Sequence, residues 1–359
     1  MTVDSPLSLE TRVKAQAFGL GFDLVGICAL GPADTADAFD DWLARGYAGS
    51  MTYLPRGRDK RRDSRLPVPG AISAIVVAMN YGGREPSGPV ARYARGDDYH
   101  DLMLERLGAL HSWLDVELGA IVRGKPYVDT GPVLERDLAR RAGLGWFGKN
   151  TNLINPVLGS FFFLGVLLVD IELAPDVPFE ADRCGTCTRC LEACPTDALV
   201  APRVLDATRC ISYLTIELKG AIPPDLRSGI GELIYGCDIC QEVCPWNERF
   251  ARPLPADSPY AARATLGVKD SCTLARELLV MNESEFRETF AGSPMKRAKL
   301  RGLKRNAAVV LGNVGVEDDR KALDQAASDP EPLVRDHARW ALTELRRRLG
   351  PHPTLDGDH

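Results

Sequence analysis

Two cysteine runs constrain this chain more than any other feature of its sequence. The first run ends in a Cys-Pro pair and reads Cys184-x-x-Cys187-x-x-Cys190-x-x-x-Cys194-Pro195. The second run reads Cys237-x-x-Cys240-x-x-x-Cys244-Pro245, and Ile234 occupies the place of its leading cysteine. Bacterial ferredoxin-type modules bind [4Fe–4S] clusters through thiolates in this pattern. We therefore expect a ferredoxin-like module with two clusters that transfers electrons.

The spacing also predicts which cysteines share a cluster. Cys210 is the available candidate for the ligand that the second run lacks. In such runs the cysteine before proline ligates the cluster of the other run. One predicted cluster therefore takes Cys184, Cys187, Cys190 and Cys244, and the other takes Cys194, Cys210, Cys237 and Cys240. Two structural zinc sites are the alternative, although zinc needs neither the Cys-Pro ending nor a crossed ligand.

Length and composition limit what the rest of the chain can be. A chain of 359 residues has room for two or three domains, so the cluster module is not the whole protein. With a net charge of -5, any contact with nucleic acid requires a local basic patch. Residues 1–6 show no secretory signal, and no apolar run approaches the roughly 18 residues of a membrane span. We expect a cytoplasmic protein in which Cys28 and Cys272 are small apolar residues.

The chain divides into three regions. Residues 1–178 combine helical periodicity with apolar runs at 24–30, 73–79 and 161–169. Runs that are apolar on both faces predict a covered sheet, so we expect an α/β or α+β catalytic domain. The cluster module follows at 179–250. Residues 272–349 predict helices that look like a HEAT-type repeat, too short to stand alone and therefore packed on the rest.

A glycine motif, Gly143-x-Gly145-x-x-Gly148, matches the dinucleotide-binding fingerprint in letters only. That fingerprint follows a strand and opens a helix, whereas this one follows the helical stretch 134–142 and leads into a strand. We interpret these glycines as a helix end and as a close approach of backbone to a bound group.

Two acidic residues stand where a strand turns into a helix. Asp129 ends a short predicted strand, before a turn and a helix that Pro132 opens. A carboxyl group there can donate a proton if burial raises its pKa, although spacing alone favours an aspartate that accepts turn hydrogen bonds. Glu135 is expected to compensate the charge of the helix N-terminus.

The tail carries a basic run without interspersed acids, made of Lys296, Arg297, Lys299, Arg301, Lys304 and Arg305. Such runs are commonly solvated helix faces. A phosphate backbone is the other partner that suits them, and the sequence leaves both interpretations open.

Several motifs together resemble one family, the epoxyqueuosine reductases, which are iron–sulfur and cobalamin enzymes of the last step of tRNA queuosine synthesis. The resemblance spans nearly the whole chain and rests on the displaced cluster ligand and on residues 92–100 (RYARGDDYH), 128–135 (VDTGPVLE), 143–151 (GLGWFGKNT) and 304–308 (KRNAA).

This resemblance implies that cobalamin is held between the first domain and the cluster module. Electrons from an external low-potential donor would pass through both clusters to cobalt and reduce epoxyqueuosine in tRNA, with oxygen leaving as water. Asp129 would be the proton donor. The implied cofactor contacts are Arg56, Asp129, Lys149, Asn150, Thr151, Ser160, Ser212 and Asp238.

The basic run would then dock the tRNA, and the basic loop at 56–62 would extend that surface. We expect a monomer that does not bind membranes. Two other hypotheses remain: a cobalamin-dependent reductase of a small organic substrate, similar to reductive dehalogenases, and a ferredoxin-like electron carrier with fused domains.

Overall fold

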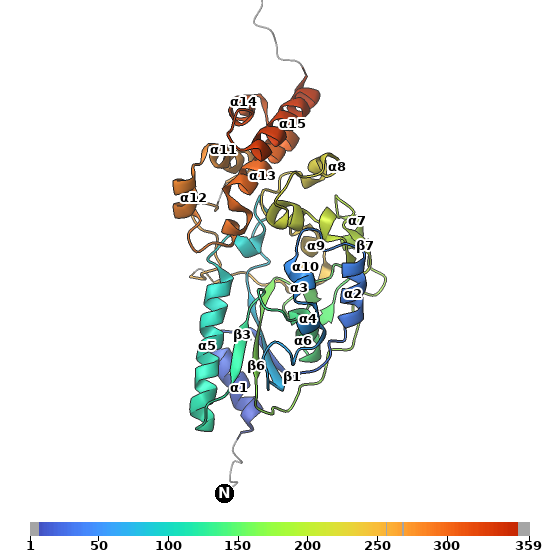
Figure 1. Cartoon of the computed structure of the whole chain (residues 1–359), viewed down its shortest axis with the longest axis vertical. Helices are drawn as coiled ribbons and strands as arrows, with labels where there is room; N and C mark the ends of the chain where they lie inside the picture. The colour runs from blue at the N-terminus through green and yellow to red at the C-terminus, as the bar shows by residue number, and fades with distance from the viewer. Residues whose placement is uncertain (1–6, 256, 268, 351–359) are drawn as a thin grey trace, which may run out of the picture.

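The structure is a computed structural model that describes residues 7–255, 257–267 and 269–350 (Figure 1). The N-terminal segment 1–6, for which the sequence predicted no signal, lies outside the described residues. In the described ranges, no helix combines the length and the apolar character that crossing a bilayer requires.

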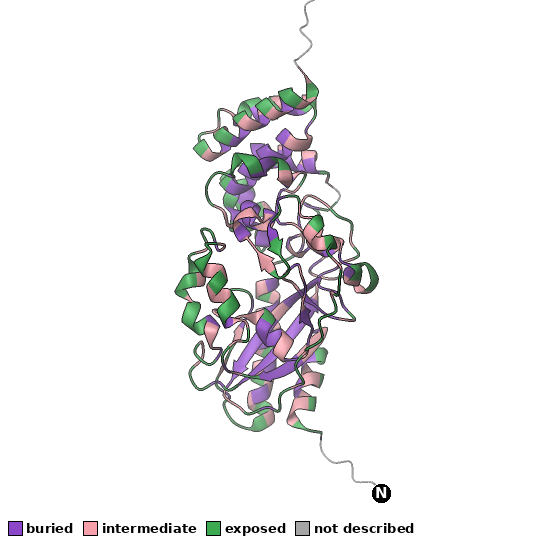
Figure 2. Cartoon of the chain, turned by 90° about the vertical axis from the view of Figure 1, so that its right-hand side faces the viewer, coloured by how far each residue is buried: buried purple, intermediate pink, exposed green. Residues whose placement is uncertain are grey.

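A four-stranded antiparallel sheet forms the core of the N-terminal region. Its strands follow the order β1 (Leu24–Ala29), β2 (Ser73–Asn80), β6 (Phe162–Val169) and β3 (Gly124–Tyr127). The central strands β2 and β6 are apolar on both faces because both faces are covered, and Figure 2 shows them buried. The antiparallel pairing makes the fold α+β rather than α/β.

Helices cover the two faces of this sheet. Alternate residues such as Ile75 and Val77 pack against α1 (Leu9–Gly19) and α5 (Tyr99–Leu118). The residues between them, such as Val76, pack against α6 (Glu135–Arg141). Figure 1 shows α1 and α5 together on one side of the sheet. The predicted covering of both faces is therefore confirmed.

Shorter elements complete the N-terminal region and depart from the predictions in two places. The basic loop predicted at 56–62 is a pair of short helices, α3 (Tyr53–Arg56) and α4 (Arg58–Arg62), which follow α2 (Ala36–Ala44). The helix expected to open at Pro132 begins at Glu135 instead.

The glycine motif connects α6 to a small hairpin, β4 (Trp146–Phe147) and β5 (Leu153–Ile154). Gly143 ends α6 with φ of 78°, as the sequence predicts. A Cβ atom on Gly145 would lie 2.2 Å from the carbonyl oxygen of Ile154. The close approach that the structure shows at Gly145 is therefore to the neighbouring strand β5.

The cysteine-rich region lies between the sheet and the C-terminal helices (Figure 1). Each cysteine run carries one short helix, α7 (Arg189–Glu192) in the first and α9 (Ile239–Glu242) in the second, and these two helices pack together. The other elements of this region are β7 (Leu199–Ala201), β8 (Val204–Leu205), the turns η2 (Ala207–Arg209) and η4 (Ser228–Ile230), the π-helix η3 (Tyr213–Glu217), and α8 (Pro224–Arg227) and α10 (Pro245–Phe250).

The C-terminal region is helical. Its central helix, α13 (Lys299–Val314), packs against its neighbours. The surrounding elements are α11 (Ser271–Val280), α12 (Glu283–Thr289), η5 (Pro294–Ala298), η6 (Glu317–Asp319), α14 (Arg320–Ala326) and α15 (Pro332–Leu349). Val90, Ala94 and Tyr235 join the same apolar core, so the tail packs on the rest of the chain as expected.

Candidate active site

One cavity lies at the first cysteine run. Its volume is about 200 Å³, and four cysteines line it: Cys184, Cys187, Cys190 and Cys244. The fourth of them comes from the second run. Four thiols from two crossed segments around one small cavity suit a [4Fe–4S] cluster. We call this space the outer cavity, because the neighbouring residues 185–186 and 188–189 are exposed.

Positive charge surrounds the outer cavity. Lys149, Arg183 and Arg189 line it, and no carboxylate is among its described lining residues. The Lys149 ammonium donates hydrogen bonds to the carbonyl oxygens of Gly185 at 2.7 Å and Cys187 at 2.9 Å. Lys149 therefore ties the hairpin to the loop that carries the first cysteines.

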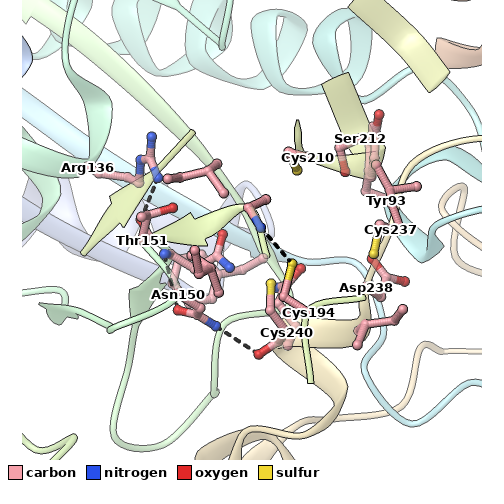
Figure 3. Close-up of a pocket in the computed structure, with 18 of the residues that line it drawn as sticks. Tyr93, Arg136, Asn150, Thr151, Cys194, Cys210, Ser212, Cys237, Asp238 and Cys240 are labelled. Carbon is pink, nitrogen blue, oxygen red and sulfur yellow. Dashed lines mark hydrogen bonds between the residues drawn. The ribbon is translucent and has the colours of Figure 1, made fainter. Parts of the chain in front are cut away.

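The larger cavity has a volume of about 480 Å³ and is lined by the other four cysteines: Cys194, Cys210, Cys237 and Cys240 (Figure 3). We call it the inner cavity. Ile234, at the place of the absent cysteine, is fully buried in the core of the C-terminal region. Burial raises the pKa of Cys237 to about 12, so this thiol would become a thiolate only where a bound metal supplies positive charge.

Asn150 lines both cavities. Its side-chain amide donates a hydrogen bond of 3.0 Å to the carbonyl oxygen of Cys240, as Figure 3 shows. The two sets of cysteines are therefore neighbours, which suits electron transfer between them.

The N-terminal region contributes a group of polar side chains to the inner cavity. Asp129 lies in a tight turn after β3, with φ of 56°, a backbone conformation that is strained for most residues other than glycine. Its side chain is 69% exposed. The Tyr99 hydroxyl donates a hydrogen bond of 3.0 Å to Asp129 Oδ2. His100 Nε2 lies 3.6 Å from the same oxygen, within ion-pair range but too far for a hydrogen bond.

His100 and Asp129 form a charged pair. Desolvation opposes the charge of His100, but the carboxylates of Asp129 and Asp98 raise the pKa of His100 to about 9. Desolvation also acts to raise the pKa of Asp129, yet His100 and the Tyr99 hydroxyl outweigh it and the pKa is lowered. The condition that the sequence analysis set for proton donation by Asp129 itself, a pKa raised by burial, is therefore not met, and in this pair the proton resides on His100 at neutral pH.

Glu135 behaves in the opposite way. Burial and the negative charge of Asp129 raise the pKa of Glu135 to about 8. Its Oε1 atom is buried and has no hydrogen-bond partner among the described residues. A carboxyl group that is neutral at pH 7 cannot compensate a helix N-terminus, so that expectation does not hold.

The predicted cofactor contacts separate into two groups. Five of the eight line the inner cavity: Asp129, Asn150, Thr151, Ser212 and Asp238. The carboxylate of Asp238 is already occupied, since the backbone N–H of Arg92 at 2.8 Å and its guanidinium at 3.1 Å both donate to it.

Three predicted contacts do not line the inner cavity. Lys149 lines the outer cavity instead. Ser160 is buried behind Gln241, whose amide donates to its hydroxyl at 3.1 Å and which itself lines the inner cavity. Arg56 lies on α3 and lines neither cavity. A corrin contact from these side chains therefore finds no support.

Sequence reasoning missed several residues of the inner cavity, among them Tyr81, Tyr93, Tyr99, Arg136 and Gln241. The tyrosines are partly or largely buried and cannot be told from core residues in a sequence. Tyr99 lies within the 92–100 motif, and this motif was the one sequence feature that could have indicated a functional role for it.

The basic run on η5 and α13 is only partly a surface. Arg305 is 1% exposed and donates to the carbonyl oxygens of Leu214, Leu218 and Gly220, so its assignment as a tRNA contact is wrong. Lys304 is largely buried and pairs with Asp329 at 3.2 Å. The prediction of an exposed basic surface fails at these two residues because α13 is buried on nearly all sides.

Four members of the run remain exposed: Lys296, Arg297, Lys299 and Arg301. Arg297 pairs with Glu217 at 2.7 Å, and its guanidinium lies 5.8 Å from the centre of the Tyr53 ring. The exposed part of the run therefore meets α3 of the N-terminal region.

Comparison with protein families matches two parts of the chain. Residues 61–130 match a family model described as epoxyqueuosine reductase QueG, DUF1730. Residues 183–247 match a model described as a 4Fe-4S double cluster binding domain. The second match supports iron–sulfur clusters over the zinc alternative.

Curated relatives cover almost the whole chain. The epoxyqueuosine reductase of Xanthomonas campestris is 43% identical over 94% of this chain and 97% of that protein. The epoxyqueuosine reductase of Escherichia coli K12 is 39% identical over 95% of this chain and 90% of that protein.

Solved structures agree with these relatives. An epoxyqueuosine reductase in complex with an epoxyqueuosine-modified tRNA-Tyr stem loop superposes with a TM-score of 0.85 at 32% identity, covering 94% of this chain and 90% of that one. The Bacillus subtilis enzyme, captured with its catalytic aspartate loop swung out of the active site, has a TM-score of 0.80 at 32% identity and the same coverage.

Proposed function

This chain belongs to the epoxyqueuosine reductase family, and on that premise we propose that it reduces epoxyqueuosine to queuosine in tRNA with electrons delivered through two [4Fe–4S] clusters. The observation that carries the proposal is the inner cavity, which is lined both by one set of cluster-type cysteines and by Asp129, the partner of His100. Electrons and a proton can meet there.

The clusters have separate places in this proposal. The outer cavity would hold the cluster that receives electrons from an external low-potential donor, because its cysteine loop lies beside exposed residues. The inner cavity would hold the cluster that passes them on. Asn150, which lines both cavities, lies between the two.

Cobalamin would be held at the inner cavity, beside the cluster that the four cysteines would bind. The lining combines apolar side chains, such as Phe163 and Leu164, with hydroxyl and amide groups, such as Ser212, Thr151 and Asn150. Sites for small molecules and cofactors commonly combine an apolar lining with a few placed polar groups. Cobalamin would supply the strongly reduced cobalt that the chemistry requires, while the protein orients the substrate and moves protons.

The Asp129–His100 pair would deliver a proton to the departing oxygen. His100 holds the proton at rest, and Asp129 Oδ2, at 3.6 Å, is the group that reaches into the cavity. Tyr99 fixes the carboxylate by its hydrogen bond at 3.0 Å. Asp129 would then act as the proton donor by relaying the proton of His100, once the 3.6 Å between Nε2 and Oδ2 shortens to hydrogen-bond distance, and the two residues would titrate as one unit.

The tRNA would bind where the exposed basic residues of η5 and α13 meet α3. Lys296, Arg297, Lys299 and Arg301 would contact phosphates, and the anticodon loop would present the modified base to the inner cavity. The relative solved with a modified stem loop supports this role. The corresponding domain assignment is a catalytic domain at 1–178, a cluster domain at 179–250 and a helical tRNA-binding tail at 272–349.

One experiment tests the proposal as a whole. Anaerobically purified protein should contain about eight irons, four for each cluster, and should bind added cobalamin as cob(II)alamin in its absorption spectrum. With a strong reductant it should convert epoxyqueuosine in intact tRNA to queuosine. Protein that binds iron and never corrin would refute the cobalamin part, and protein that binds both but leaves the tRNA unchanged would refute the substrate.

A further inference from the structure

We propose that Glu135 is a second proton donor in the inner cavity, separate from the Asp129–His100 pair. This inference rests on the proposed function, because it assigns a task within that reaction. Two features of the structure carry it: Glu135 lines the same cavity as Asp129, and its Oε1 atom is buried without a partner.

The stoichiometry of the reaction requires two protons. When an epoxide becomes an alkene, both C–O bonds break, two electrons enter from the external donor, and oxygen leaves as water. Water carries away two protons. The Asp129–His100 pair accounts for one of them, since only His100 of this pair is protonated at neutral pH. A second group with a proton is therefore needed at the same cavity.

The position of Glu135 suits that task. Glu135 is the first residue of α6, and Asp129 lies in the turn before it. Both side chains therefore reach the cavity from the segment that connects β3 to α6. The groups that face Glu135 are the carboxylate of Asp129 and the guanidinium groups of Arg136 and Arg61. Burial and the charge of Asp129 keep the proton on Glu135 below pH of about 8.

The two arginines stabilise the product of proton transfer. Arg61 is buried and is fixed by hydrogen bonds to the carbonyl oxygens of Gly131 at 3.3 Å and Tyr53 at 3.4 Å. Arg136 donates to the carbonyl oxygen of Thr151, as Figure 3 shows. Both positive charges remain near Glu135 when it becomes a carboxylate, so release of the proton does not leave an isolated buried charge.

Asp137 on the same helix shows what a purely structural carboxyl looks like. It is buried and its pKa is also raised by desolvation. However, its Oδ2 accepts hydrogen bonds of 3.0 Å from both the backbone and the hydroxyl of Thr35, and it lines neither cavity. Asp137 Oδ1, like Glu135 Oε1, has no hydrogen-bond partner among the described residues, so the difference between the two residues is their place: Glu135 lines the inner cavity and Asp137 does not.

The test uses the full-length protein with both clusters, and compares Glu135→Gln with Asp137→Asn as the matched control. Glutamine keeps the size of the side chain but has no acidic proton. First, infrared difference spectra between pH 6 and pH 10, taken without cobalamin or tRNA, should show a protonated carboxyl band that titrates near pH 8 in the wild-type protein and in Asp137→Asn. The band should be absent in Glu135→Gln.

Second, single-turnover reduction of epoxyqueuosine tRNA should be measured against pH with cobalamin bound. Wild-type turnover should fall as pH rises through about 8, and Glu135→Gln should be slower by about 100-fold at pH 7, in the range typical for loss of a general acid. Asp137→Asn should stay within about twofold of the wild type. Iron content and thermal unfolding show whether each variant is folded.

The outcomes separate this inference from the function on which it rests. If the wild-type protein does not convert the tRNA, the proposed function fails and this inference fails with it. If the wild type is active and Glu135→Gln keeps both its rate and its pH profile, only the inference is overturned. A titrating band that survives in Glu135→Gln would overturn it as well, because the proton would then reside elsewhere.

Discussion

The outer and inner cavities are built from the same cysteine pattern, yet they differ in size and in the charge of their other lining residues. The outer cavity is smaller, about 200 Å³ against about 480 Å³, and its other polar lining residues are cations and one amide. The inner cavity has tyrosines, two carboxylates from the β3–α6 connection and room for a large ligand. In the proposed function, these equivalent cysteine sites would take different tasks because of what lies beside them.

This contrast suggests a division between supply and use of electrons. A site that only relays electrons needs a cluster, a route to the surface and no proton chemistry. A site that reduces a substrate needs proton donors and space, and it needs groups whose pKa values differ. Asp129 and Glu135 line the inner cavity, and together with His100, which pairs with Asp129, they provide this difference.

The largest effect is expected from Cys210→Ala, which tests the displaced ligand of the inner cavity. Iron content should fall from about eight to about four per chain, and turnover should be lost completely, because electrons no longer reach the inner cavity. Electron paramagnetic resonance of the reduced protein should retain one cluster signal. Cys272→Ala, which changes a cysteine that lines neither cavity, should keep all iron. Full iron content in Cys210→Ala would show that another residue ligates that cluster.

The next largest effect is expected from Asp129→Asn. Asparagine tolerates the left-handed backbone of this turn, so the loop should keep its shape while losing the proton relay. Turnover should fall by about 100-fold to 10,000-fold, with iron content and corrin spectrum unchanged.

Asp197→Asn is the control for Asp129→Asn, since Asp197 also has a positive φ, of 50°, but does not line the cavity. It should keep wild-type turnover. Full activity in Asp129→Asn would remove Asp129 from the reaction and leave the inner cavity without its relay.

How much of this arrangement could be predicted depends on what each pattern encodes. Cysteine spacing is set by the geometry of the clusters. The two groups of four cysteines that line the two cavities could therefore be predicted from the sequence. Apolar runs predicted β2 and β6 within one residue of their observed bounds. The pairing direction was not encoded locally, because it depends on the connections between distant strands.

The errors have physical causes of their own. Lys149 belongs to a motif associated with the cofactor, but the hairpin turns its side chain to the carbonyl oxygens of the first cysteine loop. Arg305 looked like surface because it is charged, yet three carbonyl oxygens of the cysteine-rich region satisfy its guanidinium inside the core. Glu135 looked like a helix-start residue, and only the neighbouring Asp129 and its burial in the fold reveal its altered pKa.

A smaller effect is expected on the pH dependence of stability. Because the pKa of His100 is raised from 6.5 to about 9, its ion pair stabilises the folded state fully below pH 6.5, and this stabilisation is lost as pH rises through 9. Since Asp129 is largely exposed, we expect about 1 kcal/mol. His100→Asn should therefore flatten the decline of the anaerobic unfolding temperature between pH 6.5 and 9.5 by about 1 to 2 °C.

His111→Asn is the control for this measurement, because His111 contacts the carbonyl oxygen of Val122 at 2.8 Å and lines neither cavity. Its unfolding temperature should decline with pH as in the wild type. An unchanged decline in His100→Asn would mean that the inner cavity holds no titrating ion pair, and the contrast with the outer cavity would weaken.

The smallest effect is expected from Lys149→Met, which changes the outer cavity only. Loss of one positive charge and of two hydrogen bonds to the first cysteine loop should lower the reduction potential of the outer cluster by an amount on the order of tens of millivolts. The inner cluster should keep its potential, because Lys149 does not line the inner cavity. A redox titration followed by electron paramagnetic resonance measures both clusters in one sample. If Lys149→Met instead left both potentials unchanged and weakened cobalamin binding, Lys149 would act at the inner cavity. The assignment of Lys149 to the outer cavity would then be wrong, and the contrast between the two cavities would lose its clearest residue.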